Sequence, residues 1–349
     1  MKTTSVSTFA LSQTMRYSHS RMQVDLAKAQ KEASTGLVAD RGLALGAGTS
    51  RLVSLERDLE RLNGLVDSNA LVSTRLSATQ KSLSQLATAA QTFLSALTST
   101  ASGDASSATI TNAAKAALGG MTSILNTSMN GEHLFAGTNT DVRPLNDFTA
   151  VGSPSKAAFD AAFQAHFGFT QADPAAASIT TAQMDAFIAG GLQTQFLGAG
   201  WQANWSNATD QAIVSRIALN ETAETSVSID NDGIRKLAMA AAGIAGSFSE
   251  TTSGAAKTAL VDRAIALVGE ALSDIAELQS QTGVIEKRVK DASDRIKTQT
   301  ELFEKHILDV EGVDPYEASS RVSNLLTQIE TSYALTARLQ QLSLLKFLT

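Results

Sequence analysis

The chain has 349 residues, a net charge of −6 at pH 7 and no cysteine. Without cysteine it has no disulfides, thiolate metal sites or cysteine nucleophiles, and the negative charge argues against binding nucleic acid or an anionic membrane. Hydrophobic residues make up 43% of the chain, but aromatic residues only 5%. This composition favours long, thin helical packing over one broad globular core.

Apolar residues at helical spacing predict a first helix over residues 8–34. The side chains on its apolar face include Leu11, Met15, Met22 and Leu26. The helix is expected to end at Ser34, Thr35 and Gly36, with Gly36 as a left-handed cap. The glycines between residues 36 and 48 then predict a loop rather than continued helix.

Two long heptad patterns predict the main helices, one over residues 52–102 and the other over residues 260–310. At about 1.5 Å per residue they would be roughly 70 and 80 Å long, so an antiparallel pair is the simplest arrangement. Shorter helices are expected over residues 110–125 and 232–246. The predicted fold class is therefore mainly α, an elongated antiparallel bundle of long heptad helices from both chain ends.

Residues 143–230 differ in composition from the segments on either side. They hold most of the phenylalanines and both tryptophans, and no long helical period continues through them. We expect a small mixed α/β insert domain with its own core, flanked by the N-terminal half of a helical rod (1–142) and its C-terminal half (231–349). Exposed tryptophans would suit a sugar-binding surface, but burial of Trp201 and Trp205 in a core is the favoured interpretation.

The last segment, Pro315 to Thr349, predicts one helix that begins at a proline, where the missing N–H is tolerated. Its apolar residues include Ile329, Tyr333, Leu335, Leu339, Leu342 and Leu345. A helix this apolar needs a partner to stay folded and soluble. Because the two long heptad helices can cover each other, the first and last helices are the candidates for contacts between subunits.

No residue pattern typical of catalysis or metal binding is found in the sequence. The histidines, His19, His133, His166 and His306, stand apart from one another without metal-ligand spacing. We therefore expect no enzymatic activity, no catalytic residue, no cofactor and no metal. No window of about 18 apolar residues predicts a membrane span, and the N-terminus lacks the apolar run of a cleavable secretory signal.

Three short motifs resemble those of the flagellin superfamily of bacterial flagellar axial proteins. Ser34, Thr35 and Gly36 resemble the end of that family's first helix, and residues 310–318 resemble its break before the last helix. The run Leu134, Phe135, Ala136, Gly137, with Pro144 soon after, resembles the signature of the hook–filament junction members. Asp40, Arg41 and Gly42 stand where the family usually has paired aspartates.

This resemblance implies a structural component of the flagellum, an adaptor that joins hook to filament. It implies that residues 1–34 and 315–349 are disordered before assembly and fold as copies join into a ring or tube. The implied partners are further copies of the chain, another hook-associated junction protein on the hook side, flagellin on the filament side and an export chaperone, with neither nucleic acid nor membrane. The implied location is extracellular, reached without a cleaved signal peptide.

Two alternatives remain open from the residues alone. The chain could be flagellin, the filament subunit, because its closing residues Leu342, Ser343, Leu344 and Leu345 are similar to flagellin tails. A protein of another class, an enzyme or a carbohydrate-binding surface module carried by residues 143–230, is the further alternative, and it would need Trp201 and Trp205 to be exposed.

Overall fold

The computed structural model describes residues 8–103 and 106–347, with the side chains of residues 8, 9, 11 and 339–347 left out of the description. The described chain is mainly α-helical, with two small antiparallel hairpins in the middle of the sequence. Its elements are α1 (Thr8–Thr35), α2 (Arg41–Leu45), η1 (Gly46–Gly48), α3 (Thr49–Ala101), α4 (Ser107–Leu125), β1 (Ser128–Met129), β2 (Glu132–His133), α5 (Pro154–Phe167), η2 (Pro174–Ser178), α6 (Thr181–Phe187), η3 (Ile188–Leu192), α7 (Gln193–Phe196), η4 (Trp201–Trp205), β3 (Val214–Ala218), β4 (Glu221–Glu224), α8 (Asp232–Ser247), α9 (Gly254–Glu311) and α10 (Pro315–Phe347).

The helices form where the heptad patterns predict them. α3 has 53 residues and α9 has 58, so both long helices are confirmed. The chain divides into two compact units: residues 65–295, here called the central unit, and residues 1–64 with 296–349, here called the terminal unit. Each unit contains segments from both halves of the sequence, because α3 and α9 each contribute to both units.

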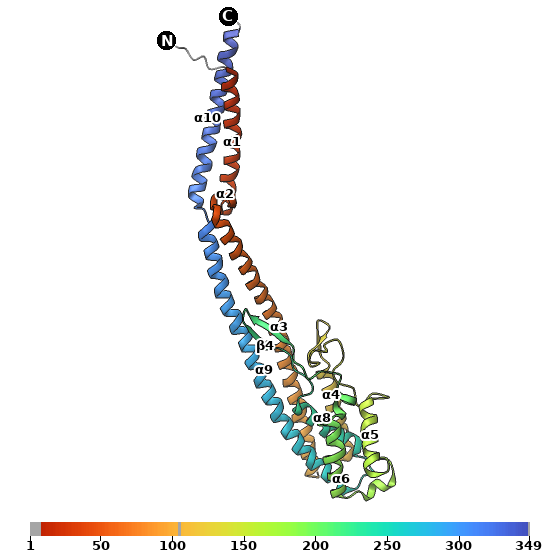
Figure 1. Cartoon of the computed structure of the whole chain (residues 1–349). Helices are drawn as coiled ribbons and strands as arrows, with labels where there is room; N and C mark the ends of the chain where they lie inside the picture. The colour runs from red at the N-terminus through yellow and green to blue at the C-terminus, as the bar shows by residue number, and fades with distance from the viewer. Residues whose placement is uncertain (1–7, 104–105, 348–349) are drawn as a thin grey trace. The chain divides into compact units, whose positions relative to one another are not determined.

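Within the central unit, α3 and α9 run antiparallel and are joined by side-chain hydrogen bonds. The Ser77 hydroxyl donates to the Glu286 carboxylate, and the Gln80 amide donates to the Gln279 carbonyl oxygen at 2.6 Å. α4 and α8 lie side by side in the same unit (Figure 1). Alanines fill much of α8, and burial of nearly its whole second half shows that it is the central helix of this bundle.

A charged contact fixes α8 against α9. The Lys236 ammonium lies 2.8 Å from an Asp274 carboxylate oxygen and 3.2 Å from one of Glu270. The hydrogen bond to Asp274, followed by the one to Glu270, raises the pKa of Lys236 above its ordinary value despite the opposing effect of burial. Lys236 is therefore charged throughout the physiological pH range and stabilises the α8–α9 contact there.

The aromatic residues of the expected insert do not form a core of their own. Phe159, Phe187, Trp201 and Trp205 belong to the same buried cluster as residues of α3, α4, α8 and α9. Both tryptophans are 1% exposed, and the Trp201 indole N–H donates to Asp230. The short helices of this region pack on the bundle, so their aromatic side chains share one buried cluster with the long helices. The insert domain with boundaries at residues 143 and 230 stays a prediction.

The Leu134–Gly137 motif forms a strap that holds the central unit together. The Phe135 carbonyl accepts a hydrogen bond from the Ile229 N–H at 3.0 Å, and the Ala136 carbonyl accepts one from the Thr209 N–H at 3.1 Å. Gly137 has φ +64°, and a Cβ added there would lie 2.3 Å from the Thr209 carbonyl oxygen. Glycine is required at this position both by the left-handed backbone and by the close approach of a second chain segment.

The strap gives a first prediction. We expect Gly137→Ala to lower the free energy of unfolding by about 2–4 kcal/mol, because left-handed strain and overpacking against backbone add together. The matched control is Gly131→Ala, which has φ +87° but nothing within 4 Å of the added methyl. That control should cost about 1 kcal/mol, the strain alone. Equal losses for the two variants in urea denaturation would contradict the steric role of Gly137.

Candidate assembly interface

The terminal unit contains an antiparallel pair of helices, α1 and α10 (Figure 1). His19 Nε2 lies 3.1 Å from the Ser332 hydroxyl, and the His19 ring lies 4.2 Å from the Tyr333 ring, centroid to centroid. Further along, the Thr336 hydroxyl lies 3.7 Å from the Met15 sulfur. These contacts show the antiparallel direction of the pair, because residue numbers fall along α10 as they rise along α1.

The structure divides the predicted contact residues into two groups. Met15, Met22 and Leu26 are half-buried and Ile329 is 9% exposed, because they lie on the stripes by which α1 and α10 face each other. Tyr333 and Leu335 are 53% and 52% exposed and remain open to a neighbour. Whether any of these residues contacts another subunit stays a prediction. The remaining predicted side chains lie outside the described residues: Leu11, Leu339, Leu342 and Leu345.

Apolar side chains are far better covered in the central unit than in the terminal unit. Both clusters of buried residues found among the described side chains lie within residues 65–295. In the terminal unit, the large apolar side chains left exposed are Tyr17, Leu43, Val24, Val53, Leu302, Leu308, Tyr316, Leu326, Tyr333 and Leu335. A pair of helices this long with only single buried residues between them is poorly stabilised on its own.

A clasp of backbone and charged contacts joins the end of α1 to the break between α9 and α10. Leu37 forms an antiparallel β-bridge with Gly312. On either side of it, the Val38 N–H donates to the Glu311 carbonyl at 2.9 Å and the Val313 N–H donates to the Gly36 carbonyl at 2.8 Å. These bonds satisfy backbone groups that the helix ends would otherwise leave without partners.

Arg41 closes the clasp with its guanidinium group. Its Nε lies 2.6 Å from Glu311 Oε2, its Nη2 donates to Glu311 Oε1 at 3.0 Å, and its Nη1 donates to Glu56 Oε1 at 2.9 Å. The Glu311 side chain is 3% exposed and the Arg41 side chain 43% exposed, so this forked ion pair is buried on its carboxylate side only. The loop expected around Arg41 is in fact a short helix, α2, because the Asp40 carboxylate caps it by accepting from the Leu43 N–H.

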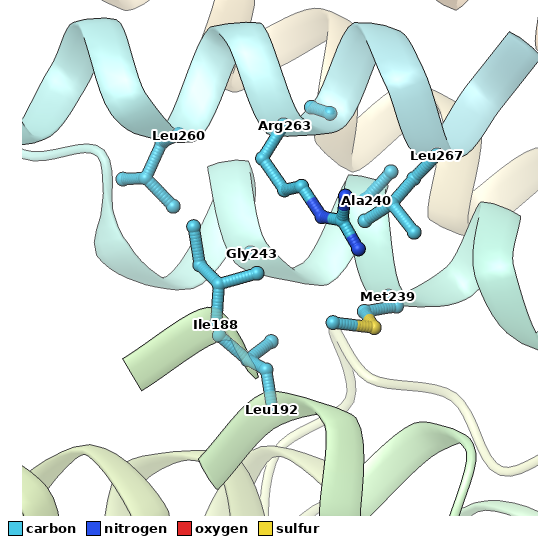
Figure 2. Close-up of a pocket in the computed structure, with 9 residues that line it drawn as sticks. Ile188, Leu192, Met239, Ala240, Gly243, Leu260, Arg263 and Leu267 are labelled. Atoms are coloured by element: carbon cyan, nitrogen blue, oxygen red, sulfur yellow. The ribbon is translucent and has the colours of Figure 1, made fainter. Parts of the chain in front are cut away.

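One cavity of the central unit is too small for a small-molecule ligand. Figure 2 shows this cavity between η3, α8 and α9, where the Arg263 side chain extends between Leu260 and Leu267 toward Met239. Its volume is about 10 Å³, room for one water molecule at most. Among residues 8–103 and 106–347, no group of three His, Asp or Glu side chains is placed to hold a metal ion.

None of the helices in the described part of the chain has both the length and the apolar composition needed to cross a membrane. The surface that stands out is the terminal helix pair, with its clasp at one end and exposed apolar side chains along its length. Long helices from both chain ends, paired with each other and incompletely covered, define a helical structural subunit.

Comparisons with known proteins identify the family. The description "Bacterial flagellin N-terminal helical region" matches residues 6–140, and "Bacterial flagellin C-terminal helical region" matches residues 265–348. The chain belongs to the bacterial flagellin superfamily and is a structural component of the flagellum. Among curated proteins, none matches the sequence.

A solved structure supports the same fold. It is described as the "Structure of putative flagellar hook-associated protein from Vibrio parahaemolyticus" and superposes with a TM-score of 0.51 at 12% sequence identity. The match covers 76% of this chain and 97% of that one. At this identity the likeness concerns the fold alone.

The clasp gives a second prediction. We expect Arg41→Ala to destabilise the clasp by about 1–2 kcal/mol, because it leaves the Glu311 carboxylate without its cation while the exposed side of Arg41 limits the loss. Amide hydrogen exchange at Val38 and Val313 should then be about tenfold faster. Arg41→Lys, which keeps the charge but loses the fork, should show a smaller change. Unchanged exchange in Arg41→Ala would show that the backbone bonds hold the clasp unaided.

Proposed function

We propose that the chain is a non-enzymatic adaptor that joins the flagellar hook to the filament. The observation that carries the junction role is the Leu134–Gly137 strap, which resembles the signature of the hook–filament junction members and has a structural reason for its glycine. The fold shared with the structure described as a "putative flagellar hook-associated protein from Vibrio parahaemolyticus" supports the same role. Burial of Trp201 and Trp205 removes the feature on which a sugar-binding module would depend.

The proposed mechanism couples folding to assembly. Residues 1–34 and 315–349 are disordered in the free chain and form α1 and α10 when neighbouring copies cover their exposed faces. The support for this mechanism is the contrast between the two units, because the buried clusters lie in the central unit while the terminal helix pair leaves many apolar side chains open. Folding of the two terminal segments costs conformational entropy, and the burial of apolar surface on assembly offsets that cost.

The proposed partners follow from the position of a junction. They are further copies of this chain in a ring or tube, another hook-associated junction protein on the hook side and flagellin on the filament side. Before assembly, an export chaperone binds the apolar terminal segments. The chain reaches the outside of the cell through the flagellar export apparatus without a cleaved signal peptide.

Flagellin is the second candidate function, favoured by one observation. Both matched family descriptions are those of the flagellin terminal regions, which filament subunits and junction proteins share. A purified chain that polymerises by itself into long filaments would be a filament subunit. A chain that stays monomeric in the absence of hook or filament would be a junction protein.

The junction role predicts a distinctive deletion phenotype. A strain that lacks this chain should build hooks but release its flagellin into the medium, because the first filament subunits then have no junction protein to bind at the end of the hook. The measurement is electron microscopy of the cell surface together with the amount of flagellin in the culture supernatant. Filaments of normal length in the deletion strain would rule out the junction role, and cells that neither build filaments nor release flagellin would point to an earlier step.

Coupled folding predicts a difference between the free and the assembled chain. In the dilute monomer, amides of residues 8–34 and 315–347 should exchange at nearly the rate of an unfolded peptide, while those of α8 should be protected. On assembly, the two terminal segments should become protected as well. The comparison is hydrogen exchange with mass spectrometry, and strong protection of both terminal segments in the monomer would defeat the mechanism without affecting the junction role.

A further inference from the structure

The dipeptide Asn-Gly occurs twice in the chain, as Asn63–Gly64 and as Asn130–Gly131. An asparagine followed by glycine is open to attack by the next backbone nitrogen, because glycine has no side chain to shield that nitrogen. All four residues are exposed, and a Cβ added at either glycine would meet nothing within 4 Å. The two sites therefore have the same sequence, exposure and free space, and they differ in the backbone that surrounds them.

Asn130 and Gly131 are the two loop residues of the β1–β2 hairpin. Met129 pairs with Glu132 across the hairpin, so no other residue belongs to the loop. Asn130 has φ +54° and Gly131 has φ +87°, the pair of left-handed conformations of a type I′ turn. Asn130 is the one residue other than glycine with positive φ in the described part of the chain, so its backbone is in a conformation that costs energy.

Neither reacting group of this turn is held by a hydrogen bond within residues 8–103 and 106–347. The Gly131 N–H has no acceptor there, and the Asn130 side-chain amide has no partner. The turn can therefore change its dihedral angles without breaking a hydrogen bond of Gly131. Local opening of such an exposed loop costs little free energy.

The other Asn-Gly dipeptide lies inside a long helix. Asn63 and Gly64 belong to α3, which runs from Thr49 to Ala101, so the Gly64 N–H donates to the carbonyl four residues earlier. The backbone of Asn63 can leave its helical conformation only if that part of α3 opens and its hydrogen bonds break. Attack by the Gly64 nitrogen is therefore slowed by the free energy of opening the helix.

We propose that Asn130 is a site of spontaneous deamidation in the folded chain, and that Asn63 is protected. The Gly131 nitrogen loses its proton to hydroxide and bonds to Asn130 Cγ, and the Cγ–Nδ2 bond breaks to release ammonia. The resulting succinimide takes up one water molecule. Addition of water at the side-chain carbonyl gives aspartate, and addition at the backbone carbonyl gives isoaspartate, whose backbone runs through Cβ and Cγ.

The groove beside the turn gives this reaction a structural consequence. Asn130 lines that groove together with Arg75 and Glu132. The Arg75 side chain is 12% exposed, its Nη1 lies 2.6 Å from Glu132 Oε2, and its Nη2 donates to the His133 carbonyl at 3.1 Å. Both products add a carboxylate to the groove. Isoaspartate also adds a carbon atom to the backbone of a two-residue loop, and so disturbs the pairing of Met129 with Glu132.

The full chain contains its own control for a test of this proposal. The purified protein would be incubated at mildly alkaline pH, and peptide mass spectrometry would follow the conversion of amide to acid at both sites. We expect Asn130 to react at least about tenfold faster than Asn63 in the folded chain. In urea the two sites should react at similar rates, because the reactive dipeptide is the same.

Two results would overturn the proposal. One is a rate at Asn63 equal to or higher than that at Asn130 in the folded chain. The other is a difference of the same size in urea, because neighbouring residues and not the fold would then set the rates. Neither result depends on whether the chain acts at the flagellar junction.

A second measurement tests the consequence for the hairpin. The His133 N–H donates to the Thr140 carbonyl at 2.8 Å and the Leu134 N–H to the Thr127 carbonyl at 3.1 Å. In incubated protein enriched in isoaspartate, both amides should exchange with solvent about tenfold faster than in fresh protein. Asn130→Asp, which adds the charge without lengthening the backbone, should exchange as the wild type does. Equal acceleration in Asn130→Asp, or no acceleration in the incubated protein, would overturn the backbone effect.

Discussion

The main constraint on this structure is that two antiparallel helices bury only a small part of each other's surface. Each helix buries the stripe that faces its partner and leaves the rest of its circumference to solvent or to a third element. In the central unit that third element exists: α4 and α8 pack with α3 and α9, and the short helices of residues 154–205 fill the remaining gaps. In the terminal unit α1 and α10 pack mainly on each other, and their exposed side chains include Tyr17, Val24 and Leu335. One chain thus combines a unit with its own core and a unit whose described apolar side chains remain largely exposed.

The main role of the clasp is to provide hydrogen-bond partners for backbone groups, and its ion pair is secondary. Where α1 ends and α9 gives way to α10, two sets of helix-terminal N–H and carbonyl groups come together. The bridge between Leu37 and Gly312 pairs some of these groups, and Gly36 at φ +68° lets the chain turn tightly enough to reach it. Arg41 then holds Glu311 from the side. A forked arginine contact defines the geometry of this break more closely than an apolar contact of the same size would.

The sequence predicts the parts of this fold that repeat and misses the parts that depend on tertiary contacts. Regular spacing of Leu52, Leu62 and their successors was sufficient for α3, and the same reasoning found α1, α9 and α10, because a heptad pattern is a local property. The glycines after residue 36 suggested a loop, but one carboxylate, that of Asp40, is enough to start α2. The burial of Phe159 and Trp205 against the bundle depends on contacts far apart in the sequence, which composition cannot reveal.

The predicted contact residues show the same limit at the surface. A search for apolar residues selects the stripe that helices use to pair within a chain, as with Met22 and Ile329, since that stripe is the most hydrophobic. The stripe of Tyr17, Arg21 and Val24 on the outer face of α1 is less hydrophobic, because a charged residue stands between its apolar residues, and all three side chains are exposed. Its residues recur at the same helical spacing as the buried stripe, so spacing alone does not separate the face that pairs within the chain from the face that stays open to solvent.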